Sequence, residues 1–409
     1  MSFEEEKQLE ETYVMHTFGR KPVELVSGQG MIAKDDKGNE YLDFIAGIGV
    51  NSLGHCHPAL SEALAKQASR LIHVSNYYYI ENRGELARDL SELLNETVPQ
   101  DQREPWQTFF ANSGAEANEC AIKLARLHAR RKALEAGADR IPRTIVTLQR
   151  SFHGRTLATL AATAQPAKQE AFQPLPDGFV AVPANDIQTI EALFEQMGNE
   201  ICAVLLEPIQ GESGVHPCTA EFLQAVRRLT KQHDALMMLD EVQCGMFRCG
   251  TYAFAFQHFG IVPDVVTMAK GIAGGVPMGA CAAPASIASA FEPGDHGSTF
   301  GGSNLAITAA KTVIDTVKSE GIAQNAAEVG AYLQERLASL EGVVAVRGLG
   351  LMVAADLAEG LDATQIAVDA LGKGLLLNAT GLHTLRFLPP LICTKYEVDT
   401  LVDRLKQLL

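Results

Sequence analysis

Short, continuously apolar runs recur through the middle of this 409-residue chain, at residues 108–111, 144–148, 179–182, 201–206, 235–239 and 265–269. A strand with one face in water alternates apolar and polar residues, whereas these runs predict strands that are covered on both faces. Helical patterns lie between them, for example at 115–131, 187–197 and 219–232. The alternation predicts an α/β fold with a mainly parallel central sheet covered by helices.

The two ends of the chain differ from this middle part. Residues 30–33 and 40–43 flank a turn at 35–38, which predicts a β-hairpin. A long helix is expected at 305–319, and the last helix begins with a capping box from Thr394 to Glu397. We expect residues 51–300 to form a large domain. Residues 1–50 and 301–409 would together form a smaller α+β domain from both chain ends.

Composition and charge exclude several classes of partner. The chain has 34 Lys and Arg against 49 Asp and Glu, a net charge of −15. With no basic cluster, neither nucleic acid nor a membrane surface is expected as a partner. The start of the chain lacks the pattern of a secretory signal, and the charge-free stretch 271–291 is too rich in Gly, Ala and Pro for a membrane span. We expect a cytoplasmic protein with reduced cysteines and no metal site.

Polar or aromatic residues follow closely after the ends of five predicted strands. They are Ser113, Phe152, Glu207, Asp240 and Lys270. Because ligands bind at the carboxyl ends of parallel strands, we expect these side chains to line one site.

Lys270 and Asp240 end two of the runs with opposite charges, which a buried ion pair alone could explain. A third element, residues 112–119, is a strand-to-helix turn whose free amides suit a phosphate, although the same residues also make an ordinary helix cap. A lysine for a Schiff base, an acid for a ring nitrogen and a phosphate cup are what pyridoxal 5′-phosphate (PLP) requires. We therefore interpret the chain as a PLP enzyme.

Each residue has a role in this interpretation. Burial would lower the pKa of Lys270, which helps it to bind the cofactor and to transfer a proton. Asp240 would keep the ring nitrogen protonated. Gln243 could donate to the phenolic oxygen of the cofactor, and Phe152 could stack on its ring.

Two arginines are candidates for binding substrate carboxylates, because guanidinium binds carboxylate with two parallel hydrogen bonds. They are Arg155 and Arg386, and the second precedes the apolar stretch 387–391, an unusual setting for a cation.

These motifs also occur in the order of a known family. They lie at residues 42–58, 112–119, 151–156, 206–212, 239–243, 270–271 and 297–302. Over almost its whole length the chain resembles the class III, ornithine-type aminotransferases of PLP fold type I, and among them the acetylornithine aminotransferases. The resemblance implies the PLP-transferase fold, with PLP bound by the large domain at 51–300.

The resemblance also implies how the cofactor is held. Lys270 matches the Schiff-base lysine, and Asp240 matches the partner of the pyridinium nitrogen. The matches to the phosphate cup are Ser113, Gly114 and Ala115, and the matches to the residues on the two faces of the ring are Val242 and Phe152. Thr299 matches a residue that reaches the phosphate of the neighbouring subunit, so a homodimer is implied.

For the substrates, the resemblance implies that Arg155 binds the carboxylate far from the reacting amine. Arg386 would bind the α-carboxylate of glutamate, and Glu207 resembles an acid that neutralises Arg386 when the other amino donor is bound. In place of the Thr of many relatives the cup has Ala115, and the loops at 247–250 and 303–304 differ from the common pattern. These loops shape the pocket and leave the donor open.

The reaction implied is transfer of the terminal amino group of N-acetylornithine to 2-oxoglutarate, a step of arginine biosynthesis. Ornithine, succinylornithine, succinyldiaminopimelate and 4-aminobutyrate are alternative donors. A binding or regulatory subunit with the same fold but no activity is an alternative of another class. Lys270, Asp240 and both arginines argue against that alternative, because such a subunit would not need them.

Overall fold

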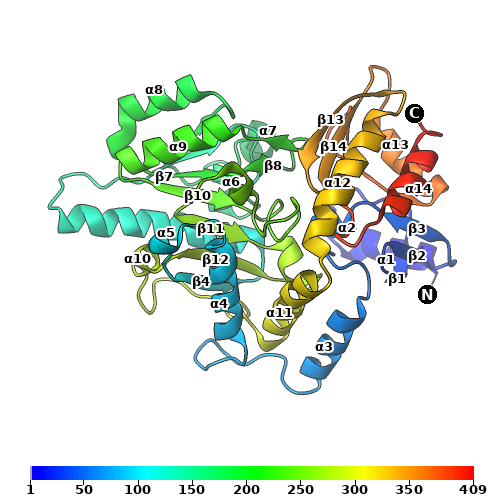
Figure 1. Ribbon diagram of the computed structural model, residues 1–409, viewed down its shortest axis with the longest axis horizontal. Coiled ribbons are helices and arrows are strands. Elements are labelled where there is room, and N and C mark those ends of the chain that lie inside the picture. Colours follow the sequence, from blue (N-terminus) through cyan, green and yellow to red (C-terminus); the bar gives the residue numbers. More distant parts are fainter. Residues whose placement is uncertain (1) are drawn as a thin grey trace.

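The computed structural model describes residues 2–409 and is built around a seven-stranded sheet (Figure 1). Its strand order is β4 (Trp106–Ala111), β12 (Gly279–Pro284), β11 (Val265–Met268), β10 (Leu236–Asp240), β7 (Ile201–Leu206), β5 (Thr144–Leu148) and β6 (Phe179–Val182). All neighbouring pairs are parallel except the two that involve β12. The predicted α/β fold with a mainly parallel sheet is confirmed.

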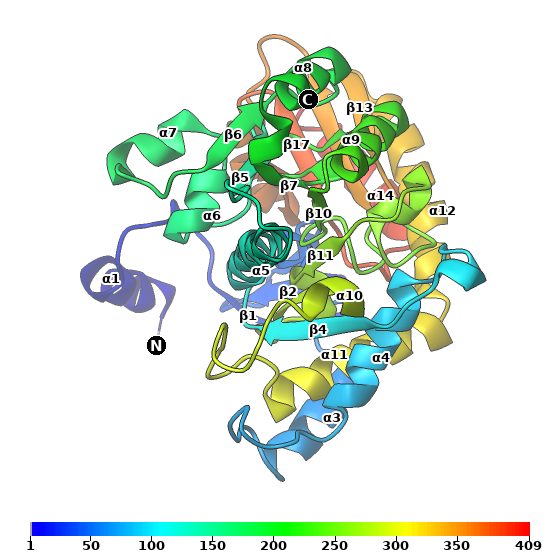
Figure 2. The same cartoon turned by 90° about the vertical axis from the view of Figure 1, so that its left-hand side faces the viewer.

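Both faces of this sheet are covered, as its apolar strands predict. Met238 packs into one hydrophobic core, while its neighbours Met237 and Leu239 pack into the other. The core that contains Met238 lies between the sheet and α5 (Gly114–Glu135). On the opposite face, α9 (Ala220–Gln232) packs on the core that contains Met237 and Leu239. In Figure 2, α5 is seen nearly end-on, in front of the strands.

Strand β12 was not predicted. Its sequence, Gly-Ala-Cys-Ala-Ala-Pro, has none of the large β-branched or aromatic residues that favour strands. It is nevertheless fully buried between β4 and β11, and α5 packs on its small side chains.

No helix among residues 2–409 is long and apolar enough to cross a membrane.

The smaller sheets join the two ends of the chain. The predicted hairpin is formed by β2 (Ile32–Asp35) and β3 (Glu40–Asp43), with β1 (Leu25–Gln29) beside β2. β15 (Leu375–Leu376), from the C-terminal part, pairs in parallel with β3. A second four-stranded sheet has the order β13 (Val343–Leu349), β14 (Met352–Leu357), β17 (Thr384–Phe387) and β16 (Asn378–Ala379). A short hairpin pairs β8 (Ile209–Gln210) with β9 (His216–Pro217).

The helices complete these layers. In Figure 1, α11 (Asn304–Ser319) and α12 (Ile322–Ala338) run from the large sheet to the smaller ones. The expected capping box of Thr394 and Glu397 opens α14 (Lys395–Leu405). The other helices are α1 (Phe3–Tyr13), α2 (Ala46–Gly49), α3 (Pro58–Ala68), α4 (Arg83–Leu94), α6 (Leu157–Ala162), α7 (Pro166–Gln169), α8 (Ile187–Met197), α10 (Ala285–Ala288) and α13 (Ala363–Asp369).

Candidate active site

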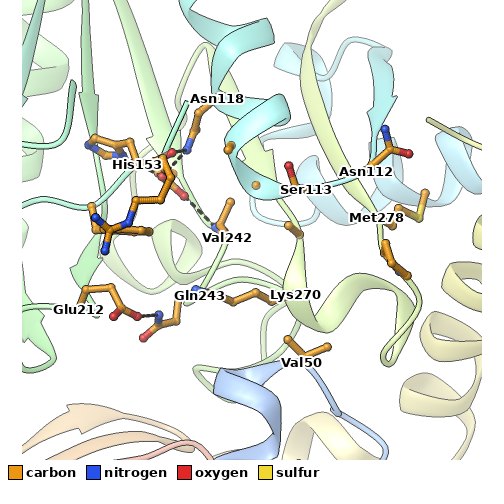
Figure 3. Close-up of a pocket in the computed structure, with 18 of the residues that line it drawn as sticks. Val50, Asn112, Ser113, Asn118, His153, Glu212, Val242, Gln243, Lys270 and Met278 are labelled. Atoms are coloured by element: carbon orange, nitrogen blue, oxygen red, sulfur yellow. Dashed lines mark hydrogen bonds and ion pairs between the residues drawn. The ribbon is translucent and has the colours of Figure 1, made fainter. Parts of the chain in front are cut away.

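The carboxyl ends of the strands meet at one cavity of about 380 Å³ (Figure 3). Asp240 is the last residue of β10, and Lys270 follows β11, the parallel neighbour of β10. The predicted site residues that line this cavity are Ser113, Gly114, Ala115, Phe152, Arg155, Glu207, Asp240, Val242, Gln243 and Lys270. Of the predicted set, Arg386 contacts this group through Gln243, and Thr299 lies elsewhere.

Lys270 begins a short 3-10 helix and has a φ of +47°. A left-handed backbone costs a non-glycine residue roughly 1–2 kcal/mol, and such strain concentrates at functional sites. In Figure 3 its side chain extends toward Val242 and Gln243. Burial lowers the pKa of Lys270; nearby Glu212 opposes this, and Arg386 adds to it. The uncharged amine that attacks a carbonyl is therefore easier to form than in an exposed lysine.

The N-terminus of α5 forms a cradle for an anion. Ser113 is the N-cap, and its Oγ accepts from Glu116 N at 3.2 Å. The amides of Gly114 and Ala115 have no acceptor within residues 2–409, as expected for the first turn of a helix. A Cβ on Gly114 would lie 2.7 Å from Val242 Cγ1, so only glycine fits there. Free amides and the helix dipole suit a phosphate.

Asp240 is held by donors on three sides. Its Oδ2 accepts from Asn118 Nδ2 at 2.7 Å and from His153 Nδ1 at 2.8 Å, and its Oδ1 accepts from Val242 N at 3.0 Å. Thr267 Oγ1 donates to Asn118 Oδ1 at 2.7 Å and so fixes the amide. A carboxylate has about four acceptor positions, which leaves one for a ligand.

Asn118 and His153 were missed by the sequence analysis. Asn118 lies one turn into the helix that starts at the phosphate cup, and His153 follows Phe152, so both belong to motifs that had been noted. Burial of His153 disfavours its charged form, but the hydrogen bond and charge of Asp240 raise its pKa overall. The raised pKa favours a protonated His153 in its 2.8 Å contact with Asp240.

Arg386 does not pair with Glu207, and this expectation is wrong. Arg386 Nη1 donates to Glu212 Oε1 at 2.7 Å and to Gln243 Oε1 at 3.1 Å, while Nη2 donates to Asn378 Oδ1 at 2.8 Å. Both acids lie in the motif at 206–212, so sequence alone did not show which one faces the arginine.

The two acids have opposite electrostatic environments. Glu207 accepts from Phe152 N at 3.0 Å and from Gly211 N at 3.2 Å, and burial raises its pKa to about 7. Burial would also raise the pKa of Glu212, but the charges of Arg386 and Lys270 outweigh it and lower the pKa to about 2. Glu212 is therefore the carboxylate that neutralises Arg386.

Two cations lie at the ring of Phe152. Arg155 Cζ is 5.5 Å and Lys168 Nζ is 5.8 Å from its centroid. Neither forms an ion pair with a carboxylate within the described part of the chain, although Lys168 donates to Gln165. Burial and the charge of Arg155 lower the pKa of Lys168. Lys168 was not predicted, because a lysine on a short surface helix gives no signal in sequence.

Thr299 does not line the cavity of Lys270 in its own chain. It lies in a separate hollow of about 1020 Å³, with His73, Tyr77 and Tyr79 among its neighbours. Its expected contact with the phosphate of another subunit stays a prediction.

The cavity fits PLP. Its volume is within the usual range of ligand pockets, about 300–1,000 Å³. The free amides at Gly114 and Ala115 suit the phosphate, the remaining acceptor position of Asp240 suits the ring nitrogen, and the amine of Lys270 suits the aldehyde.

Comparison with known proteins gives the same result. The family model described as Aminotransferase class-III matches residues 15–409. The acetylornithine aminotransferase of Caldanaerobacter subterraneus subsp. tengcongensis is 47% identical and is aligned over 98% of both chains.

Solved structures agree. The acetylornithine aminotransferase of Elizabethkingia anophelis is 31% identical, with a TM-score of 0.86 over 99% of this chain and 98% of that one. The ornithine aminotransferase of Toxoplasma gondii is 27% identical, with a TM-score of 0.91 over 100% of this chain and 95% of that one. This chain therefore belongs to the class III aminotransferases, enzymes that use PLP.

Proposed function

We propose that this enzyme transfers the terminal amino group of N-acetylornithine to 2-oxoglutarate. The observation that carries the proposal is the asymmetry of charge around the Lys270 amine. On one side Arg155 and Lys168 have no acidic partner, and on the other Arg386 is neutralised by Glu212. A donor whose carboxylate lies far from its reacting amine, such as N-acetylornithine, needs only the side of Arg155 and Lys168. The name of the relative with 47% identity supports this donor.

Each protein group has a defined task in this reaction. PLP, when bound, supplies the electron-accepting ring on which an amino group can be exchanged. Lys270 Nζ would remove the proton from the substrate carbon that carries the amine and deliver it to the cofactor, after which water releases the carbonyl product. Asp240, oriented by His153 and Asn118, holds a proton at the ring nitrogen. Phe152 and Val242 line the same cavity and would contact the two faces of the ring.

The second substrate requires a different charge arrangement. 2-Oxoglutarate and glutamate carry two carboxylates, so both Arg155 and Arg386 are needed to bind them. Arg386 can accept a carboxylate only if Glu212 gives up its 2.7 Å contact. Moving Glu212 lets one site hold two substrates of different length and charge.

Replacing Glu212 by Gln tests this exchange. Loss of the charge leaves Arg386 without its neutralising partner, so the enzyme should favour glutamate over N-acetylornithine. We expect the ratio of kcat/KM for N-acetylornithine to that for glutamate to fall roughly tenfold. Steady-state kinetics of both directions measures it. Glu207→Gln serves as the contrast and should leave the ratio unchanged, because Glu207 does not touch Arg386. If this ratio fell in Glu207→Gln and stayed unchanged in Glu212→Gln, the assignment of Glu212 would be contradicted.

Replacing Lys168 by Met removes one cation from the Phe152 end. The contact is partly exposed, so the effect should be modest. We expect KM for both 2-oxoglutarate and the donor to rise about fivefold, with kcat within about twofold of the wild type. Lys132→Met, on an exposed part of α5, is the control. Unchanged KM values would remove Lys168 from the binding site.

Donor preference tests the proposed reaction itself. We expect kcat/KM to be highest for N-acetylornithine when it is compared with ornithine, succinylornithine, succinyldiaminopimelate and 4-aminobutyrate. Ornithine is the second candidate, since the Toxoplasma gondii structure with a TM-score of 0.91 is an ornithine aminotransferase. A clear preference for any of the other donors would overturn the substrate and leave the chemistry in place. No turnover with any donor would overturn the activity.

We also propose that the enzyme is a homodimer in which Thr299 completes the phosphate site of its neighbour. Large aromatic side chains close to Thr299 are exposed in the single chain, with Tyr77 at 93% and Phe300 at 63%. Exposed aromatic surface of this kind supports the proposal that a second subunit covers it.

A cytoplasmic location also stays a proposal.

Subunit mixing tests the role of Thr299. Variants Lys270→Ala and Thr299→Ala should each lose activity, strongly and partly respectively. In a mixed dimer, one site would carry both defects and the other would carry neither. Activity should therefore recover after the two variants are unfolded and refolded together. No recovery in a verified mixed dimer would show that Thr299 acts within its own chain or not at all.

A further inference from the structure

Two buried cysteines face each other outside the active site. Cys120 lies on α5 and Cys281 lies on β12, and both belong to the hydrophobic core between that helix and the sheet. Their side chains line the same cavity of about 260 Å³, next to Phe109 and Phe291. This cavity gives a small molecule space beside both sulfur atoms.

Cationic and imidazole groups stand next to this pair. Lys123, less than one turn after Cys120, donates from Nζ to His296 Nδ1 at 3.1 Å. The His296 ring packs against Phe109, with centroids 4.6 Å apart, and stacks on Phe291 at 5.8 Å. Because Lys123 occupies Nδ1, the neutral ring carries its proton on Nε2 and can donate it to the Cys120 sulfur.

These contacts favour the thiolate of Cys120. The pKa of Cys120 is lowered to about 6, mainly by a hydrogen bond from the Cys281 thiol. Burial would raise this pKa, whereas His296 and Lys123 lower it further. The same hydrogen bond, together with burial, raises the pKa of Cys281, which therefore keeps its proton. Cys202 lies in the same core without such partners, and burial raises its pKa to about 12.

We propose that Cys120 and Cys281 form a peroxide-reactive thiol pair that closes to a disulfide between α5 and β12. The Cys120 thiolate attacks one oxygen of hydrogen peroxide, the O–O bond breaks, and Cys120 becomes a sulfenic acid while hydroxide leaves. The Cys281 thiol then attacks that sulfur, and its proton leaves with the second hydroxyl as water. Two thiols are oxidised, and one peroxide is reduced to two waters.

The pair differs from ordinary core cysteines in having both a stabilised thiolate and a second thiol in contact. The lowered pKa of Cys120 makes a larger share of it thiolate at neutral pH than is the case for a free cysteine. The lower nucleophilicity of a low-pKa thiolate offsets part of this gain. Relative to Cys202, we expect the pair to be oxidised at least about tenfold faster.

The test treats the folded holoenzyme with hydrogen peroxide at pH 7 and follows it by mass spectrometry. The background is Cys56→Ser, which removes the exposed cysteine. We expect a loss of two hydrogens, a cross-linked peptide that contains Cys120 and Cys281, and reversal by a dithiol reductant. Oxidation of other cysteines before this pair, or equal rates at Cys202, would overturn the proposal.

Single substitutions separate the two roles. Cys281→Ser should stop the reaction at the sulfenic acid, which a dimedone-type probe then labels at Cys120. Cys120→Ser should abolish both labelling and cross-link, and Cys202→Ser should change neither. Thermal unfolding checks that each variant is folded, and Cys120→Ala replaces Cys120→Ser if the hydroxyl is not tolerated in the core. Cross-linking that survives the loss of Cys120 would also refute the assignment.

Discussion

Lys270→Ala is expected to lower transamination by at least about 10⁴-fold, because it removes both the amine that binds the cofactor and the base that moves the proton. The lowered pKa of Lys270 and its place in the Asp240 cavity are the structural reasons. The remaining contacts of the cavity, the cup at Gly114 and the carboxylate of Asp240, are unchanged in this variant. It should therefore still bind PLP, but without a covalent link.

Borohydride reduction followed by denaturation measures that link directly. In the wild type the cofactor should stay on a peptide that contains Lys270, and in Lys270→Ala it should be released. Lys34→Ala, on the exposed hairpin, is the control and should behave as the wild type. A rate for Lys270→Ala within tenfold of the wild type would rule out Lys270 as the catalytic lysine.

Asp240→Asn is expected to lower kcat by roughly 10³-fold, the scale of losing a preorganised electrostatic contact. The amide has no charge to hold a proton at the ring nitrogen. One of its positions would also place an NH₂ group against Asn118 or His153, both of which now donate to Asp240. Single-turnover kinetics with saturating donor would measure the loss.

The two variants should differ in one readout. Asp240→Asn leaves Lys270 in place, so borohydride should still attach the cofactor to the chain. Asp264→Asn, which alters a carboxylate that immediately precedes β11 and pairs with Arg227, is the control. If Asp240→Asn lost activity and borohydride also no longer attached the cofactor to the chain, Asp240 would act by positioning Lys270 and not by keeping the ring nitrogen protonated.

The sequence predicted the parts of this site that depend on backbone topology. Continuous apolar runs define the strands, and the carboxyl ends of parallel strands meet at one edge of the sheet, so the sequence alone predicts that Lys270 and Asp240 lie together. The turn at 112–119 followed from helix-capping chemistry in the same way. The strand ends and the turn could both be predicted because each depends on the residue pattern of a short segment.

Side-chain direction over longer distances could not be predicted. Glu207 and Glu212 are five residues apart, and Glu212 lies in the turn between β8 and β9, which directs it toward Arg386. Lys168 reaches Phe152 from a short surface helix. Strand β12 was missed because Ala and Gly give no strand signal, although tertiary packing buries them there.

Following the nitrogen atom tests the proposed reaction most directly. N-acetylornithine labelled with ¹⁵N at its terminal amine would be incubated with the enzyme and 2-oxoglutarate, and the glutamate formed would be analysed by mass spectrometry. The proposed transfer predicts glutamate that carries the label, with one turnover of donor for each glutamate formed and none with Lys270→Ala. Unlabelled glutamate, or no glutamate while the cofactor is bound, would contradict it.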